Sequence, residues 1–491
     1  MPTPDEPGAG QTASATHRRL ARNTVYSAVG ELSNAFLFVL FFVAARSLAP
    51  EAFGEYRTAL AFVGLFRLLP DLGMSYALTI EISRDRGQAS RLIGNLLGFQ
   101  VVLSALTLTA CLSIAAWLYR EGDATSTIVA VLAVDLLLKA FKSTIRWLLK
   151  SYEFFGVEAV SLTAERCVLL LVGFAVLHSG SGAFAFALVF LAVRLPDVVV
   201  LLTYVSRRVL PLRVQWDHAL WWELARKGLP FAYAGAVILA FFQIDIVMIE
   251  RIRGTQEAGL YGLPTLVLEG LTLVPRILGY ALIPTMAALY ARSPEGVADL
   301  YRRGVRYLLL VGLPIAAFGA VAAEPFMILL GGADYAPSAV AAWWLIPSGA
   351  LMFLSNFGET TLYCVNRRST IVVVSTLALA VNVALNLLWI PRFGFEGAAW
   401  ATVITEGSYF AMTAGALHAY GYRISWLSVA IRPVSSTGVF ALTLWLTLGP
   451  LPLLAAAAAA SAAWVAATFA FRVWTPGERE VAREWARRLR R

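Results

Sequence analysis

The stretch TIVVVSTLALAVNVALNLLWI, residues 370–390, carries no charged side chain. The tetrapeptide PRFG follows it, and a second apolar run, FEGAAWATVITEGSYFAMTAGALH, occupies residues 395–418. A helix needs about 20 mainly apolar residues to cross a hydrocarbon core that is roughly 30 Å thick. Each run is long enough to cross a bilayer once, so we predict two spans joined by a short link.

Similar apolar runs fill almost the whole chain, and no segment between them could hold a soluble domain. The protein is 59% hydrophobic and 14% charged, whereas soluble domains carry about 25% charged residues. We therefore predict an all-α polytopic membrane protein with about 14 transmembrane helices. The predicted spans are residues 25–47, 58–80, 92–118, 126–149, 157–178, 182–204, 228–250, 258–290, 303–323, 336–362, 370–390, 395–418, 430–449 and 451–473.

The positions of Lys and Arg predict the orientation, because cytoplasmic loops of membrane proteins are enriched in these residues. With the N-terminus placed in the cytoplasm, most of the 40 basic residues fall in cytoplasmic segments and the adjoining helix ends. External loops receive few of them, and Arg57 is one of these. The bias alternates from loop to loop, so we expect an even number of crossings with both termini in the cytoplasm.

A basic stretch with Pro211 separates the first six predicted helices from the next six. The hexapeptides EAFGEY (Glu51–Tyr56) and EAGLYG (Glu257–Gly262) occupy matching places in the two blocks, and parallel repeats place a binding site between two halves. We predict a disordered cytoplasmic tail and juxtamembrane segment (1–22), a first lobe (23–204), a cytoplasmic linker (205–227), a second lobe (228–418), a final helix pair (419–473) and a basic amphipathic cytoplasmic tail (474–491).

Charged residues inside predicted spans need a partner or a watery cavity, since a charge at mid-helix costs a few kcal/mol. Arg67 and Asp71 are four residues apart in the second helix, and Arg194 and Asp197 are three apart in the sixth. Residues at these spacings share one face of a helix. Both pairs fit closed structural ion pairs and substrate contacts equally well.

Three further helices carry buried charges. The fifth contains Glu158, Glu165 and Arg166, the eighth contains Glu269 and Arg276, and the seventh contains Asp245. Arg166 and Arg276 have at most one nearby carboxylate each in the sequence, so we favour a cavity position for them. The candidate substrate-binding residues are therefore Arg67, Asp71, Arg166, Arg194, Asp245, Glu269 and Arg276.

The fourth helix carries Asp135, Lys139, Lys142, Arg146 and Lys150, at spacings that place them on one face. They form a basic ridge that would lead in from the cytoplasmic side. The ridge fits either an approach path for an anionic substrate or the anchoring of long basic side chains at the membrane surface. Arginine suits bidentate contact with phosphate oxygens, so an anionic lipid with a diphosphate headgroup would fit such a cavity.

Motifs for nucleotide binding, hydrolytic catalysis or metalloprotease chemistry are missing in any plausible context. Cys111, Cys167 and Cys364 are far apart, so we expect neither a metal site nor a disulfide framework. The net charge of +9 lies in short loops and at the C-terminus, without a nucleic-acid motif. We expect no enzyme activity, no cofactor and no nucleic-acid partner.

Several stretches resemble the Wzx-type polysaccharide flippases of the multidrug/oligosaccharidyl-lipid/polysaccharide (MOP) exporter superfamily. Each is only loosely specific, and their order and spacing across nearly the whole chain carry the resemblance. They are LAPEAFGEY (Leu48–Tyr56), DLGMSYAL (Asp71–Leu78), FFQIDIVMIERIRGTQEAGLYGLPTLVLEGLTLVPRILGYALIPTM (Phe241–Met286), GGADYAPSA (Gly331–Ala339) and NLLWIPRFGFEGAAWATVITE (Asn386–Glu406).

The resemblance implies two six-helix lobes around a central cavity, a final helix pair and alternating access. It implies a multi-pass protein of a bacterial inner membrane that moves an undecaprenyl-diphosphate-linked oligosaccharide to the outer leaflet, with membrane lipids, a coupling ion (Na⁺ or H⁺) and polysaccharide polymerase or export proteins as partners. Cavity arginines would hold the diphosphate. The alternatives are a lipid II-type flippase, a cation-coupled multidrug antiporter, and a non-transporting scaffold of the cell envelope.

Overall fold

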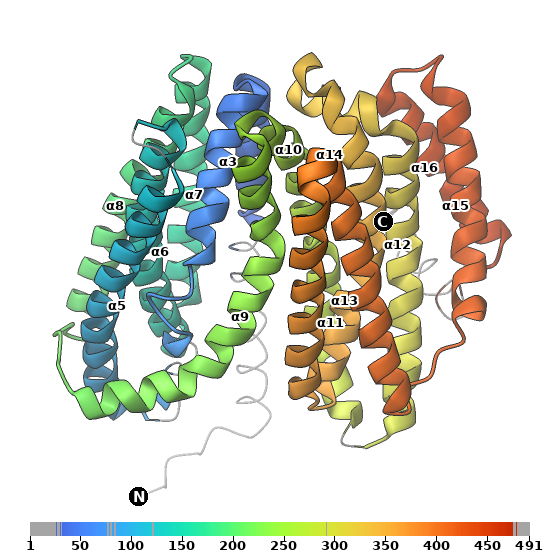
Figure 1. The fold of residues 1–491 in the computed structure, drawn as a ribbon. Helices are drawn as coiled ribbons and strands as arrows, with labels where there is room; N and C mark the ends of the chain where they lie inside the picture. The colour runs from blue at the N-terminus through green and yellow to red at the C-terminus, as the bar shows by residue number, and fades with distance from the viewer. Residues whose placement is uncertain are drawn as a thin grey trace, which may run out of the picture. The chain divides into compact units, whose positions relative to one another are not determined.

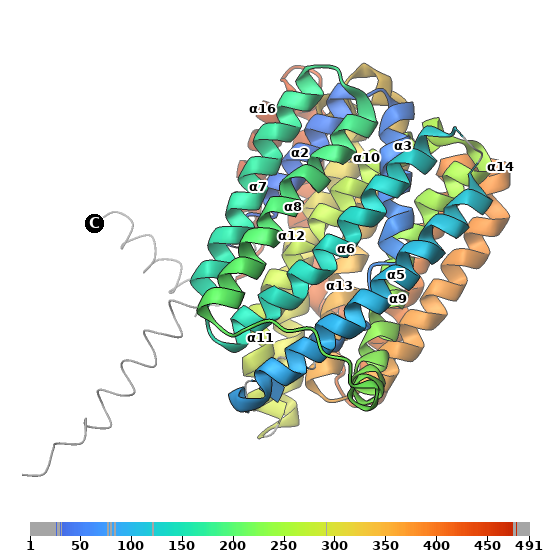
Figure 2. The same ribbon diagram turned by 90° about the vertical axis from the view of Figure 1, so that its left-hand side faces the viewer.

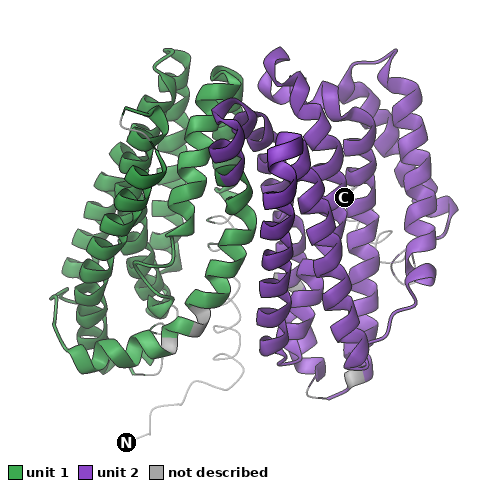
Figure 3. Cartoon of the chain, viewed as in Figure 1, with its two compact units in different colours: residues 1–247 green, residues 248–491 purple. Residues whose placement is uncertain are grey.

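A computed structural model describes residues 26, 30, 32–75, 78, 81–82, 85–119, 122–290, 292–474 and 478. Helices make up nearly all of these residues, and the described part of the chain contains no strand. The chain divides into two compact units, residues 1–247 (unit 1) and 248–491 (unit 2) (Figure 3). The predicted tail at 1–22 lies outside the described residues, as does the predicted tail at 474–491 apart from Trp474 and Glu478.

Unit 1 is a bundle in which α6 has a central place. α6 packs against α8, α3, α5 and α7, and α7 also packs against α2 and α8 (Figures 1 and 2). The elements of this unit are α2 (Ala35–Ser47), α3 (Pro50–Leu65), η1 (Arg86–Gln88), α5 (Ala89–Leu118), α6 (Ala124–Ser151), α7 (Phe155–His178), α8 (Gly182–Arg208) and the larger part of α9 (His218–Arg253).

Unit 2 is arranged around α13, which packs against α12, α14, α11 and α10. The α15–α16 pair packs against α12 through small and aromatic side chains, among them Ala322, Phe440 and Ala456. The elements are α10 (Thr255–Leu271), α11 (Leu273–Tyr290), α12 (Pro294–Gly331), η2 (Ala333–Ser338), α13 (Ala339–Cys364), α14 (Arg368–Ala419), α15 (Trp426–Leu448) and α16 (Leu453–Ala470).

The predicted fold class is confirmed. Within the described residues, 11 helices are long and apolar enough to cross a membrane. One of them, α14, contains two predicted spans, because its backbone breaks at Gly394 with φ 59° and ψ −142°. Only glycine fits there, since a Cβ would lie 2.2 Å from Oε2 of Glu257. That same oxygen accepts a hydrogen bond from the Phe395 amide over 3.1 Å, which holds the break in place.

The predicted second span, 58–80, is not one continuous helix. α3 ends at Leu65, and residues 66–73 form successive turns. Pro70 removes a helix hydrogen bond, and Leu72 and Gly73 adopt positive φ values of 45° and 72°. Arg67 and Asp71 therefore do not share a helix face. Arg57, predicted in an external loop, lies inside α3 with 2% of its surface exposed.

The broken segment of α3 packs closely against α9 within unit 1. A Cβ at Gly228 would lie 2.3 Å from the Leu72 carbonyl oxygen, and one at Gly235 would lie 2.6 Å from the Leu68 side chain. Irregular backbone at membrane depth must be covered by protein or line a cavity, because lipid cannot satisfy its polar groups. The glycines of α9 let it cover this break at close range.

The predicted linker, 205–227, is only partly irregular. α8 continues to Arg208 and α9 begins at His218, ten residues before the predicted span at 228. Asp217 explains the early start, because its carboxylate accepts the Leu220 amide hydrogen bond over 3.2 Å and so caps α9. The division into lobes and linker stays a prediction.

Candidate functional site: a cationic network in unit 1

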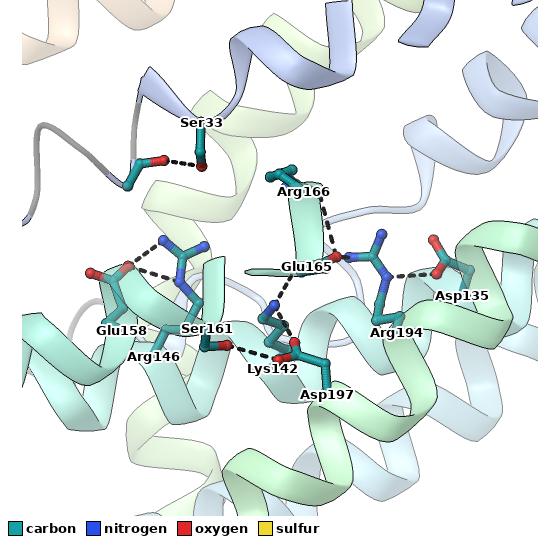
Figure 4. A network of polar contacts seen from close by, with 11 residues as sticks. Ser33, Asp135, Lys142, Arg146, Glu158, Ser161, Glu165, Arg166, Arg194 and Asp197 are labelled. Atoms are coloured by element: carbon teal, nitrogen blue, oxygen red, sulfur yellow. Dashed lines mark hydrogen bonds and ion pairs between the residues drawn. The ribbon is translucent and has the colours of Figure 1, made fainter. Parts of the chain in front are cut away.

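Charged side chains of α6, α7 and α8 meet inside unit 1 (Figure 4). On α6 the basic ridge falls on one side, as its spacing predicts. Lys142 of this ridge is 3% exposed, and Arg146 and Lys150 are half-buried. Lys139 is exposed, and the positive charges of Arg67, Arg194 and Arg166 act on it.

Glu165 of α7 is the hub of the network. Arg194 of α8 approaches its Oε1 to 3.2 Å and Arg166 approaches it to 3.4 Å, while Lys142 of α6 forms an ion pair with Oε2. In Figure 4 the three basic side chains point toward this one carboxylate, which is 3% exposed. Removing a carboxylate so deeply from water is tolerated here because three cations surround it.

A closed ion pair between Arg194 and Asp197 is one of the two interpretations of their spacing, and the structure gives each of them other direct partners. Arg194 donates from Nε to Asp135 of α6 over 2.6 Å, whereas Asp197 pairs with Lys142 and accepts a hydrogen bond from Ser161 over 2.8 Å. Packing between helices overrides spacing within one helix, because buried charges choose the partners that the bundle core offers. α6, α7 and α8 are thereby tied together by ion pairs.

A second carboxylate lies near the end of α6. Glu158 accepts a hydrogen bond from Nε of Arg146 over 2.8 Å, and Lys150 lies 3.5 Å from the same oxygen. The side chains of Arg146 and Lys150 are 24% and 26% exposed, whereas Glu158 is buried. The network therefore runs from the buried core at Glu165 to a partly accessible end.

The network holds more positive than negative charge. Its basic members are Lys139, Lys142, Arg146, Lys150, Arg166 and Arg194, and its carboxylates are Asp135, Glu158, Glu165 and Asp197. Arg166 is 7% exposed, and its Nε is a buried donor without a hydrogen-bond partner among the residues that the structure describes. An orphaned charged donor in a low-dielectric interior attracts an anion strongly.

Asp71 lies beside the network. It accepts hydrogen bonds from the amide and hydroxyl of Ser75 over 3.1 and 2.7 Å. The Ser75 hydroxyl lies 2.9 Å from Thr144 of α6, which donates to Gln100 of α5 over 3.0 Å. These neutral residues cannot be singled out from the sequence, because Ser, Thr and Gln in apolar helices give no signal that separates a network from helix packing.

The remaining predicted residues lie elsewhere. Asp245 is buried on α9, and Arg67 is exposed in the turns after α3. The predicted eighth span is divided into α10 and α11, so Glu269, half-buried on α10, and Arg276, exposed on α11, lie on separate helices. Both belong to unit 2, and the network of unit 1 is complete without them. The structure therefore brings together Arg166, Arg194 and most of the ridge, but not the whole predicted set.

The sequence matches the family described as Polysaccharide biosynthesis protein over residues 20–290, more than half of the chain. The protein belongs to this family. A second match, to the family described as MatE, covers residues 230–388. No curated protein matches the chain.

Solved structures of transporters share the fold of this family member. The inward closed conformation of the lipid II flippase MurJ matches with a TM-score of 0.74 at 10% identity, covering 91% of this chain and 99% of MurJ. An inward-facing multidrug resistance MATE family transporter of the MOP superfamily matches with a TM-score of 0.67 at 13% identity, covering 82% and 98%. Its outward-facing conformation matches with a TM-score of 0.58 at 13% identity, covering 82% and 96%.

These matches place the protein among the transporters and flippases of the MOP superfamily. The fold is common to lipid and drug transporters, so it does not decide the substrate. The substrate class therefore has to be inferred from the chemistry of the network in unit 1.

Proposed function

We propose that this protein moves an undecaprenyl-diphosphate-linked oligosaccharide from the cytoplasmic to the outer leaflet of a bacterial inner membrane for polysaccharide biosynthesis. The observation that carries the proposal is the buried donor of Arg166 within a network that has excess positive charge. A diphosphate brings negative charge and acceptor oxygens, which would balance the excess positive charge and accept a hydrogen bond from Nε of Arg166. The match to the polysaccharide family supports this substrate class over other anions.

The mechanism follows from the gradient of burial along the network. Lys150 and Arg146, at the accessible end, meet the headgroup first. The diphosphate then displaces Glu165 from Arg166 and Arg194, or Asp135 from Arg194. The lipid tail stays in the bilayer. The carboxylates re-form their ion pairs when the headgroup leaves, so the same residues that bind the anion also release it. Alternating access of the two lobes would expose the site on either side in turn.

The proposal includes the partners and the membrane orientation that the sequence predicts. Membrane lipids surround the helices, a coupling ion (Na⁺ or H⁺) supplies the energy, and polysaccharide polymerase or export proteins receive the product. Both termini lie in the cytoplasm. Arg67, Asp71 and Asp245 of unit 1 and Glu269 and Arg276 of unit 2 stay candidate substrate contacts in this proposal.

A lipid II-type flippase is the second candidate, because lipid II also carries a diphosphate and MurJ shares the fold. A multidrug antiporter that exports cations fits less well, since the network of unit 1 contains more basic than acidic residues. A non-transporting scaffold would need the ion pairs only for stability, and it leaves the donor of Arg166 unexplained.

The test is flipping of a fluorescent undecaprenyl-diphosphate oligosaccharide in proteoliposomes. We expect Arg166→Ala to abolish flipping while the protein stays folded, because Glu165 keeps Arg194 and Lys142 as partners. Arg207→Ala is the matched control, since Arg207 is exposed at the end of α8. Wild-type flipping by Arg166→Ala would overturn the site, and preference for a lipid II headgroup would select the second candidate.

A further inference from the structure

Unit 2 contains a carboxylate at the centre of a helix. Glu406 lies on the second half of α14, which runs from the break at Gly394 to Ala419. At 1.5 Å per residue, Glu406 is roughly 18–20 Å from either end of this half. Its side chain is 2% exposed, so neither water nor a lipid headgroup reaches it in this conformation.

No cation compensates Glu406. Among the described residues, no Lys, Arg or His forms an ion pair with Glu406 or with Glu359 of α13. The carboxylates of the unit 1 network differ in this respect, because each has a basic partner. A carboxylate buried without a cation is expensive to keep ionised, and such groups become neutral by binding a proton.

The groups that face Glu406 are neutral or acidic. From α13 these are Ser355 and Glu359, and from α14 itself Tyr409. From α10, the hydroxyl of Tyr261 lies 3.1 Å from Thr402, one turn before Glu406. None of them neutralises a negative charge at Glu406.

The hydrogen-bond geometry at Ser355 agrees with a protonated partner. Its Oγ lies 3.1 Å from the Leu351 carbonyl oxygen, 3.2 Å from that of Met352 and 3.3 Å from Oε2 of Glu406. A serine has one hydroxyl proton, and carbonyl oxygens only accept. Ser355 therefore divides one proton among three acceptors, and Glu406 receives less than one full hydrogen bond from it.

A second acidic contact lies one turn further along the same helix pair. The hydroxyl of Tyr409 donates to Oε2 of Glu359 over 3.0 Å. Tyr409 follows Glu406 by three residues on α14, and Glu359 follows Ser355 by four on α13, so the two contacts are successive rungs between these helices. Glu359 is half-buried and close to the end of α13 at Cys364.

We propose that Glu406 is a proton-binding site of unit 2. Tyr409 and Glu359 form the next step for the proton along α13 and α14, and proton movement here drives transport. A proton from water joins a Glu406 carboxylate oxygen, and its release restores the anion, so charge and atoms balance without a redox partner. The last clause rests on the proposed function, whereas proton binding at Glu406 does not.

Infrared spectroscopy of the purified protein in liposomes tests the site without any substrate. We expect the carboxylic-acid C=O band of the wild type to disappear in Glu406→Gln and to shift in Ser355→Ala, which removes the contacting hydroxyl. The band should persist in the control Glu295→Gln, because Glu295 is exposed in the first turn of α12. A band that is unchanged in both Glu406→Gln and Ser355→Ala would overturn the assignment. Ser355→Ala keeps the test decisive if Glu406→Gln does not fold.

Transport then tests the coupling. We expect an imposed proton gradient to accelerate flipping by the wild type, and Glu406→Gln to lose this acceleration while it keeps lipid binding and gradient-free flipping. Acceleration that survives in Glu406→Gln, or that follows a Na⁺ gradient at constant pH, would overturn the coupling. Wild type that shows the infrared band but flips nothing would leave the proton site standing and reject the proposed function instead.

Discussion

Arg194 of α8 donates from Nε to Asp135 of α6 over 2.6 Å, and its NH1 lies 3.2 Å from Glu165 of α7. One guanidinium therefore joins three helices of unit 1 while it is only 3% exposed. A fork-shaped cation suits this role better than Lys would, because it presents donors in two directions at once.

Loss of this guanidinium should destabilise unit 1. Removing one partner of a buried ion pair typically costs about 3–5 kcal/mol, because the other charge stays buried and uncompensated. We expect Arg194→Met to lower the thermal unfolding midpoint in detergent. The double variant with Asp135→Leu should recover part of that loss, and a double variant no more stable than the single one would contradict the pairing.

The two ends of the basic ridge should respond differently to neutralisation. Lys142 pairs with both Glu165 and Asp197 and its side chain is 4% exposed, so Lys142→Met should destabilise the protein strongly. Lys150→Met should change the free energy of unfolding by no more than about 1 kcal/mol, because Lys150 is partly accessible and Glu158 keeps Arg146 as its partner. Transport by Lys150→Met should become slower and less sensitive to salt. Equal stability of the two variants would refute the gradient of burial along the ridge.

The segment between α8 and α9 should detach when α5 gains a methyl group. A Cβ at Gly98 would lie 2.4 Å from the Gln215 carbonyl oxygen, and one at Gly94 would lie 2.2 Å from that of Arg213. We expect Gly98→Ala to raise hydrogen exchange and protease cleavage in residues 209–217. Gly415→Ala is the control, because nothing lies within 4 Å of its Cβ position. Unchanged protection in Gly98→Ala would argue against this docking.

Docking of the same segment should weaken at acidic pH. Asp217 lies outside the spans, and the Arg91 guanidinium, donating over 2.9 Å, together with the Leu220 amide holds the pKa of its carboxyl below the ordinary value of 3.8. Because the docked state prefers the carboxylate, its stabilisation is present above that ordinary value and is lost as pH falls through the lowered pKa. Hydrogen exchange of residues 209–220 between pH 6 and pH 2 would measure this, with Asp217→Asn expected to remove the pH dependence. A wild type as protected at pH 2 as at pH 6 would contradict it.

Helices of membrane proteins can be read from the sequence because the bilayer imposes a length and an apolar composition on each crossing. The spans from 92 to 204 coincide with α5 to α8 within a few residues at most boundaries. The break of α3 at Pro70 was readable in principle, since Pro and Gly stand three residues apart there. Its cover by Gly228 and Gly235 depends on contacts far apart in the chain, and no local pattern reports them.

The sequence by itself determined the membrane class, the helical architecture and the residue types of the cationic site, because each follows from composition and from spacing along one helix. Only the tertiary structure decided the partners: Arg194 with Asp135 instead of Asp197, Glu165 as the hub, and Glu406 without a cation. The physical reason is that a buried charge takes the opposite charge that lies nearest in space, and helix packing alone sets which residues are near.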